Sequence, residues 1–285
     1  MGNKIILSAD STCDIGPEMQ QRYNVQLFHA QILLGGKTCH DGVDIWPDDL
    51  YRAWREEGLL PRTSAIMPVQ YEEKFSQWVA QGCDVVHISL GTGITSSYQN
   101  ACHIAEEMGH VYPVDSASLS TGFGLLVVKA GEMIEAGMAA PDIQKALGEM
   151  NRRTNASFVL DTLEFMRAGG RCSAVAAFGA NLLQLKPGIR VDNHSGGKMS
   201  VGKKYRGAME RVLPEYVKDQ LGGCGDLELE HVFITHSGSP DSDIELVRQE
   251  IARYAEFRQV HVTRASCTIS AHCGPRTLGV LFMTK

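Results

Sequence analysis

The sequence predicts an α/β fold in two domains, the first with a mostly parallel sheet covered by helices on both faces and the second with a mixed or antiparallel sheet. The chain has 285 residues, more than a single hydrophobic core usually serves, which favours two domains over one. In its first half, short apolar runs alternate with amphipathic segments, the pattern of strand–helix–strand units. We place the domains at 1–154 and 155–285. The last residues of the second domain can lie at the interface between the two.

The elements of the first half follow from apolar runs and helix-start signals. Proline or small polar residues precede each predicted helix, and β-branched residues dominate each predicted strand. The predicted strands are 4–9, 25–34, 85–90 and 111–114, and the predicted helices begin near Pro47, Pro68, Ser97, Ser120 and Pro141. Small polar residues follow three of these strands, at 10–14, 91–97 and 115–118, which is the edge where ligands bind in parallel sheets.

The second half lacks this regular alternation. A strand at 157–161 precedes the turn Gly169-Gly170-Arg171, and an apolar, alanine-rich helix is predicted over 174–183. Two strands flanking 193–197 form a predicted hairpin, because asparagine, serine and glycine favour its tight turn. The remaining predicted elements are helices at 209–220 and 242–254 and strands at 232–235, 260–262 and after 279.

One stretch, 85–101, organises the first domain. An apolar strand ends in Gly91 and Gly93, and a helix begins after Ser96, which with Gln99 matches a capping box. A helix start of this kind presents unpaired backbone N–H groups and the positive end of the helix dipole. The stretch therefore suits a phosphate or carboxylate, and it suits an ordinary strand–helix connection equally well.

Composition excludes several function classes. A net charge of −6 without a basic run argues against a nucleic-acid partner. The eight cysteines contain no C-x-x-C pair, which indicates reduced thiols rather than a disulfide framework or a zinc site, and the histidines show no metal-ligand spacing. We find no signal peptide and no apolar run of about 18 residues, so we expect a cytoplasmic protein that does not span a membrane.

An enzymatic alternative rests on nucleotide binding. Gly91-x-Gly93-x-x-Ser96 nearly matches the dinucleotide fingerprint, and Asp115 ends the next strand about twenty residues later. This pattern favours a nucleotide-dependent oxidoreductase or phosphotransferase. No G-x-S-x-G nucleophile elbow and no Walker A loop are present.

Seven short motifs occur in order along the whole chain. The first half carries the opening D-S-T-x-D, a T-S pair, a glycine turn ending in Y-Q-x-A, and V-D-S with later glycines. The second half carries L-x-x-M-x-x-G-G-R, K-P and H-x-G-P. They are found at 10–14, 63–64, 91–101, 114–124, 163–171, 186–187 and 272–275. Together they make the chain similar to the DegV family from end to end.

The resemblance implies a DegV-like two-domain fold and a non-enzymatic, lipid-binding protein without cofactor or metal. It implies that a long-chain fatty acid lies between the domains and is presented to a separate kinase, as in the acyl-carrying subunit of bacterial fatty acid kinase. The expected ligand-binding residues are Thr63, Ser64, Thr92, Gly93, Ser96, Arg171, His272 and Gly274. Arg276 departs from the family, which usually has glycine there.

Overall fold

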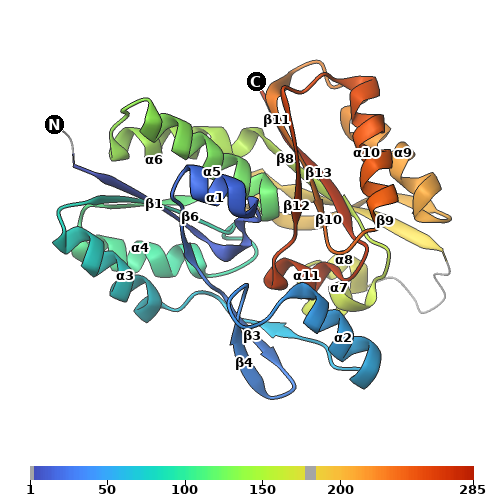
Figure 1. Cartoon of the computed structure of the whole chain (residues 1–285), viewed down its shortest axis with the longest axis horizontal. Helices are drawn as coiled ribbons and strands as arrows, with labels where there is room; N and C mark the ends of the chain where they lie inside the picture. Colours follow the sequence, from blue (N-terminus) through green and yellow to red (C-terminus); the bar gives the residue numbers. More distant parts are fainter. Residues whose placement is uncertain (1–2, 177–183) are drawn as a thin grey trace.

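The computed structural model describes residues 3–176 and 184–285, and in this part the strands form three sheets. The first sheet has four strands that are all parallel, in the order β2-β1-β6-β7. They are β1 (Ile5–Asp10), β2 (Gln26–Phe28), β6 (Asp84–Ser89) and β7 (Val111–Asp115). Two of them, β1 and β6, are labelled in Figure 1. The predicted parallel sheet is confirmed, because the apolar runs that suggested it are the buried central strands.

Helices cover both faces of this sheet. On one face, α3 and α4 bury an aromatic and aliphatic cluster that includes Tyr71, Phe75 and Ile104. On the other face, α5 and α6 bury a larger cluster. The helices are α1 (Gly16–Arg22), α3 (Pro68–Ala80), α4 (Ser97–Met108), α5 (Ser120–Glu135) and α6 (Ala140–Met150). The predicted arrangement is therefore correct on both faces.

The predicted strand over 25–34 is wrong, since the chain divides there between two sheets. β2 pairs with β1, whereas β3 (Gln31–Leu34) pairs antiparallel with β4 (Lys37–His40) and β5 (Arg62–Thr63). This small third sheet and α2 (Pro47–Glu57) project from the molecule at the bottom of Figure 1. Alternate residues stay apolar across the division, at Phe28, Ala30 and Ile32, so periodicity alone could not place it.

The second large sheet is mixed, as predicted. Its order is β10-β9-β8-β13-β11-β12, and only β11 and β12 run parallel. Its strands are β8 (Thr154–Val159), β9 (Leu185–Asp192), β10 (Lys198–Arg206), β11 (Leu227–His236), β12 (Gln259–Arg264) and β13 (Leu278–Thr284). The division of the chain at 154/155 remains a prediction.

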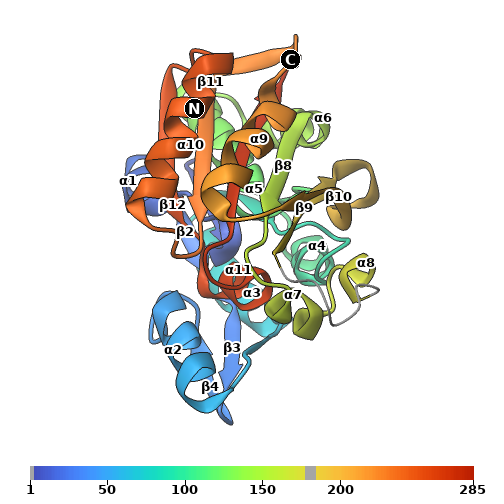
Figure 2. The same cartoon turned by 90° about the vertical axis from the view of Figure 1, so that its right-hand side faces the viewer.

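Two long helices cover the outer face of this sheet, and three short ones lie at its end (Figure 2). The long helices are α9 (Met209–Leu221) and α10 (Asp241–Tyr254), and the short ones are α7 (Glu164–Gly169), α8 (Ser173–Ala176) and α11 (Cys267–Cys273). Most of the predicted alanine-rich helix, 177–183, lies outside the described residues. Helix α11 was not predicted.

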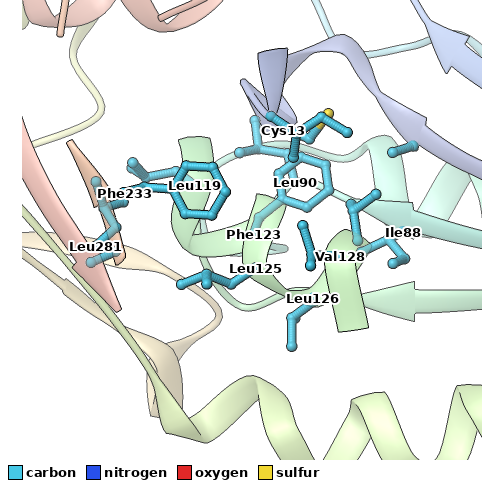
Figure 3. Packing of buried hydrophobic residues seen from close by; sticks show 14 of the residues in the cluster. Cys13, Ile88, Leu90, Leu119, Phe123, Leu125, Leu126, Val128, Phe233 and Leu281 are labelled. Carbon is cyan, nitrogen blue, oxygen red and sulfur yellow. The ribbon is translucent and has the colours of Figure 1, made fainter. Parts of the chain in front are cut away.

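Helix α5 forms the centre of the molecule, because it contacts strands of both large sheets. Figure 3 shows Leu119, at its start, and Phe123 packed with Leu90 of one half and Phe233 and Leu281 of the other. Apolar residues surround the helix, as expected for one buried on all sides. A helix in this position holds the two halves together.

Arg276 has a positive φ of 55°, which a residue other than glycine rarely adopts. Its Nε atom donates to Asp243 Oδ2 at 2.8 Å, and Nη2 donates to Glu210 Oε1 at 2.5 Å. Asp243 is buried in the first turn of α10, and Glu210 belongs to α9. The arginine that departs from the family pattern thus joins α9 to α10.

Over 3–176 and 184–285, no helix is long and apolar enough to cross a membrane.

Candidate functional site

A single large cavity lies where the three sheets meet. About 960 Å³ of space lies between its lining atoms when the solvent at its open mouth is included. The ends of β1 and β6, the start of α5, and residues of β8, β11, β13 and α11 all contribute to its wall. Apolar side chains dominate the wall, and they include Ile66, Ile94, Leu119, Phe158, Met166, Met199, Ile269 and Leu281.

Helix α11 crosses the wall of this cavity and is held by two buried carboxylates. Asp41 accepts hydrogen bonds from the backbone N–H groups of Cys267 at 2.7 Å and Thr268 at 3.0 Å, the first residues of the helix. Asp14 accepts from the backbone N–H of Ser266 at 2.9 Å and from Ser120 Oγ at 2.6 Å. Burial raises the pKa of Asp14 to about 7. These contacts fix the helix that carries His272.

His272, in the last turn of α11, meets Thr63 at the end of β5. The His272 Nε2 and Thr63 Oγ1 atoms are 2.8 Å apart, although the residues lie 209 positions apart in the chain. Burial, aided by the charge of Arg171, lowers the pKa of His272 to about 4, so the ring is neutral near pH 7. The structure therefore confirms that these two predicted residues come together.

The environment of Nδ1 indicates which tautomer His272 adopts. Nδ1 is buried and has no hydrogen-bond partner among the described residues, and it packs against the Cα of Gly169. A buried N–H without a partner is rarer than a buried acceptor without one, which favours the Nε2–H tautomer. In that tautomer His272 donates to Thr63 Oγ1, and the Thr63 hydroxyl proton is free to donate to a ligand.

Two further predicted residues line the cavity near this pair. Ser64 follows Thr63 directly, and Arg171 follows the Gly169-Gly170 turn after α7. Both are exposed, and the Arg171 guanidinium donates to the carbonyl of Gly169 at 2.7 Å. Gly274 does not line the cavity; it ends α11 with φ +76° beside Phe165. The mouth of the cavity therefore carries one positive charge and several hydroxyl groups.

The glycine turn does not offer the free N–H donors that its sequence suggested at residues 91–93. Its N–H groups already bond within the protein, those of Gly91 to Ser118 O, Thr92 to Asp115 Oδ1 and Gly93 to Gly196 O, at 2.7–3.1 Å. Thr92 Oγ1 also donates to Asp115 Oδ2 at 2.8 Å. Thr92, Gly93 and Ser96 lie outside the cavity wall.

The glycines of this turn instead admit the β9–β10 hairpin. A Cβ at Gly93 would lie 2.6 Å from Ser195 O, and one at Gly91 would lie 2.5 Å from Gly196 O. Asp115, which the nucleotide alternative needs for a ribose, is bonded to Thr92, and this arrangement removes the support for that alternative. The predicted capping box is also wrong, because the Ser96 side chain makes no cap hydrogen bond.

Sequence reasoning missed several polar side chains in the wall. Thr12 and Thr268 line the cavity and are 2% and 7% exposed, and neither hydroxyl has a hydrogen-bond partner in the described part of the chain. Thr95 and Ser97 were not missed, since they belong to the turn 91–97 predicted to bind an anion, and they line the cavity with their hydroxyl oxygens 3.1 Å apart. The polar cluster at 10–14 was the signal for Thr12, whereas nothing in the sequence placed Thr268 beside it.

Comparison with known proteins agrees with this architecture. A family model described as "Uncharacterised protein, DegV family" matches residues 4–285. The chain is similar to a DegV domain-containing protein of Clostridium perfringens, with 25% identity over 99% of both chains.

Two solved structures share the fold. One is described as fatty acid binding of a DegV family protein from Thermus thermophilus, with a TM-score of 0.89, 25% identity, and coverage of 99% of this chain and 100% of that one. The other is described as DegV, a fatty acid binding protein from Bacillus subtilis, with a TM-score of 0.82, 23% identity and coverage of 100% of both chains.

Proposed function

The chain belongs to the DegV family, and we propose that it binds a long-chain fatty acid in the cavity, with the carboxylate at Thr63 and His272. One observation carries the proposal: a half-buried pair, the neutral His272 ring and the Thr63 hydroxyl, lies in the wall of a cavity that is otherwise mostly apolar. The relative from Thermus thermophilus, described by its fatty acid binding, supports the same ligand class. A fatty acid needs both a polar contact for its head and a dry wall for its tail.

The head group is held by donors rather than by a cationic imidazole. Thr63 donates its hydroxyl proton to the carboxylate, while His272 fixes the orientation of that hydroxyl through Nε2. Hydrogen bonds to an ionised acceptor are about twice as strong as neutral ones. Arg171 adds a positive charge at the mouth, and Ser64 adds a second hydroxyl.

The tail lies along the apolar wall between the two large sheets. Phe158 of β8, Met166 of α7 and Leu281 of β13 contribute to this wall, and Leu119 closes it from the side of α5. Phe165 of α7 lies outside this wall and packs against Tyr51 and Trp54.

The finer part of the proposal concerns what happens to the bound acid. A separate kinase phosphorylates the carboxylate while it is bound, and this chain carries the acid without performing chemistry itself. The exposure of Ser64 and Arg171 supports this arrangement, since the head end of the cavity reaches the surface there.

Thr63→Val tests the head-group assignment. The substitution keeps the side-chain shape and removes one charge-assisted hydrogen bond worth about 1.5–3 kcal/mol, so the affinity for hexadecanoic acid should fall about tenfold to a hundredfold. The affinity for hexadecan-1-ol, whose head is uncharged, should change much less. Isothermal titration of the delipidated protein with both ligands measures the difference.

Thr92→Val is the matched control, because the Thr92 hydroxyl bonds Asp115 and not the cavity. This control should leave the ratio of acid to alcohol affinity unchanged. Equal losses of acid and alcohol in Thr63→Val would show that valine had only disturbed the packing. In that case the carboxylate would bind elsewhere in the protein.

A further inference from the structure

A second polar region of the cavity lies apart from the Thr63–His272 pair, at the carboxyl ends of β1 and β6. In the strand order β2-β1-β6-β7, the connections from β1 and β6 lead to opposite edges of the sheet. Ligands in parallel sheets bind at such a switch point. Asp10 at the end of β1 and Leu90 after β6 both line the cavity there.

The polar groups around this region are almost all paired. Asp10 accepts from the Tyr71 hydroxyl at 2.9 Å and from the backbone N–H of Leu90 at 2.9 Å. Asp41 accepts the first N–H groups of α11, so the start of that helix offers no free donors from Cys267 or Thr268. Among the described residues that line the cavity, the buried side-chain atoms without a partner are the hydroxyls of Thr12 and Thr268 and, at the head group, His272 Nδ1.

These two hydroxyls belong to neighbouring segments. Asp41 Oδ2 accepts both from Ser11 Oγ at 3.3 Å and from the backbone N–H of Thr268 at 3.0 Å, so the segment before Thr12 meets the start of α11. Thr12 and Thr268 are both more than nine-tenths buried, line the cavity, and lack hydrogen-bond partners within the described residues. A buried hydroxyl without a partner costs free energy, and a ligand oxygen would recover it.

The spacing of Thr268 and His272 on α11 gives the distance between the two unpaired threonines and the carboxylate of the bound acid. The two residues are four apart on α11, so they lie on one face and about 6 Å apart along the helix axis. Ile269 and Cys273 complete the face of α11 that lines the cavity. A ligand whose carboxylate bonds Thr63 therefore passes Thr268 within its first few carbons.

We propose that Thr12 and Thr268 bind a hydroxyl group near the carboxyl end of the acid, so that the protein accepts long-chain hydroxy fatty acids. This inference rests on the proposed function, since the carboxylate must first bind at Thr63 and His272. A hydroxyl on the ligand both donates and accepts, which matches two threonine hydroxyls. An unsubstituted acid leaves both threonines without partners.

The experiment compares delipidated protein titrated with hexadecanoic acid and with its 3-hydroxy, 5-hydroxy and 16-hydroxy derivatives. We expect at least one of the 3- and 5-hydroxy acids to bind as tightly as hexadecanoic acid or more tightly. The 16-hydroxy acid, whose hydroxyl lies at the far end, should bind more weakly. A finding that both near-head hydroxy acids bind at least tenfold more weakly than hexadecanoic acid would overturn the inference.

Variants locate the effect. Thr268→Val should lower the affinity for the preferred hydroxy acid about threefold to tenfold, which is the contribution of one neutral hydrogen bond. The affinity of the same variant for hexadecanoic acid should stay within about twofold of the native value. Thr12→Val should do the same, and Thr268→Ser, which keeps the hydroxyl, should restore binding. Equal losses for all acids would overturn the inference. Failure of hexadecanoic acid and the hydroxy acids alike to bind would overturn the proposed function as well, whereas failure of the hydroxy acids alone would leave it intact.

Discussion

Gly169→Ala is expected to weaken hexadecanoic acid binding by about a hundredfold. A Cβ at Gly169 would collide with the His272 ring, and its nearest atom would be Nδ1. The φ of Gly169 is not positive, so alanine fits the backbone of α7 and the damage falls on the ring alone. Displacing the ring removes the orientation of Thr63 and distorts the head pocket, a loss equivalent to the one charge-assisted hydrogen bond that Thr63 donates, about 3 kcal/mol at the upper end of its range.

A double-mutant cycle separates this effect from general damage. If His272 transmits the effect, His272→Ala should weaken binding in the native chain and add little to Gly169→Ala. Gly148→Ala is the matched control, because nothing lies within 4 Å of its added Cβ in α6, and it should leave the affinity unchanged. Native affinity in Gly169→Ala would show that the histidine takes no part in binding the head group.

Gly93→Ala is expected to lower the free energy of unfolding by about 2–4 kcal/mol. Its Cβ would meet two backbone carbonyl oxygens, Ser195 O at 2.6 Å and Gly196 O at 3.0 Å, which cannot move aside as a flexible side chain can. Overpacking of this kind costs about 1–3 kcal/mol, and the hydrogen bond from Gly93 N–H to Gly196 O contributes about 1 kcal/mol more.

Urea unfolding followed by circular dichroism measures this loss, which should lower the midpoint without changing the slope. Gly225→Ala serves as the control, since its added Cβ meets nothing within 4 Å and its φ is not positive. A Gly93→Ala variant as stable as the native protein would mean that the hairpin does not rest on the glycine turn in solution.

The sequence allowed the parallel sheet to be predicted because its strands are buried on both faces and read as continuous apolar runs. The third sheet could not be predicted, since one alternating apolar pattern continues from β2 into β3, although the two strands pair in different sheets. Helix α11 was missed because seven residues rich in small polar side chains carry little helical periodicity. Its start depends on Asp41, more than 220 residues earlier in the chain.

The candidate site shows the same limit. Thr63 and His272 were expected to bind the ligand, and the structure brings them within hydrogen-bond distance. The glycine turn was predicted to bind an anion because glycine lets an acceptor approach the backbone closely. In the structure that acceptor is a carbonyl of the distant β9–β10 hairpin and not a ligand phosphate. Thr268 could not be found, because only the folded chain brings its segment beside the cluster at 10–14.

Native mass spectrometry of the freshly purified, full chain tests the central proposal most directly. We predict a mass increment of one long-chain fatty acid per chain, lost on delipidation and regained when hexadecanoic acid is added. At a hundred times its dissociation constant the acid should also add about 2.7 kcal/mol to the free energy of unfolding, visible as a higher Tm. A purified chain without lipid, whose mass and Tm stay unchanged after addition of C14–C18 acids, would contradict it.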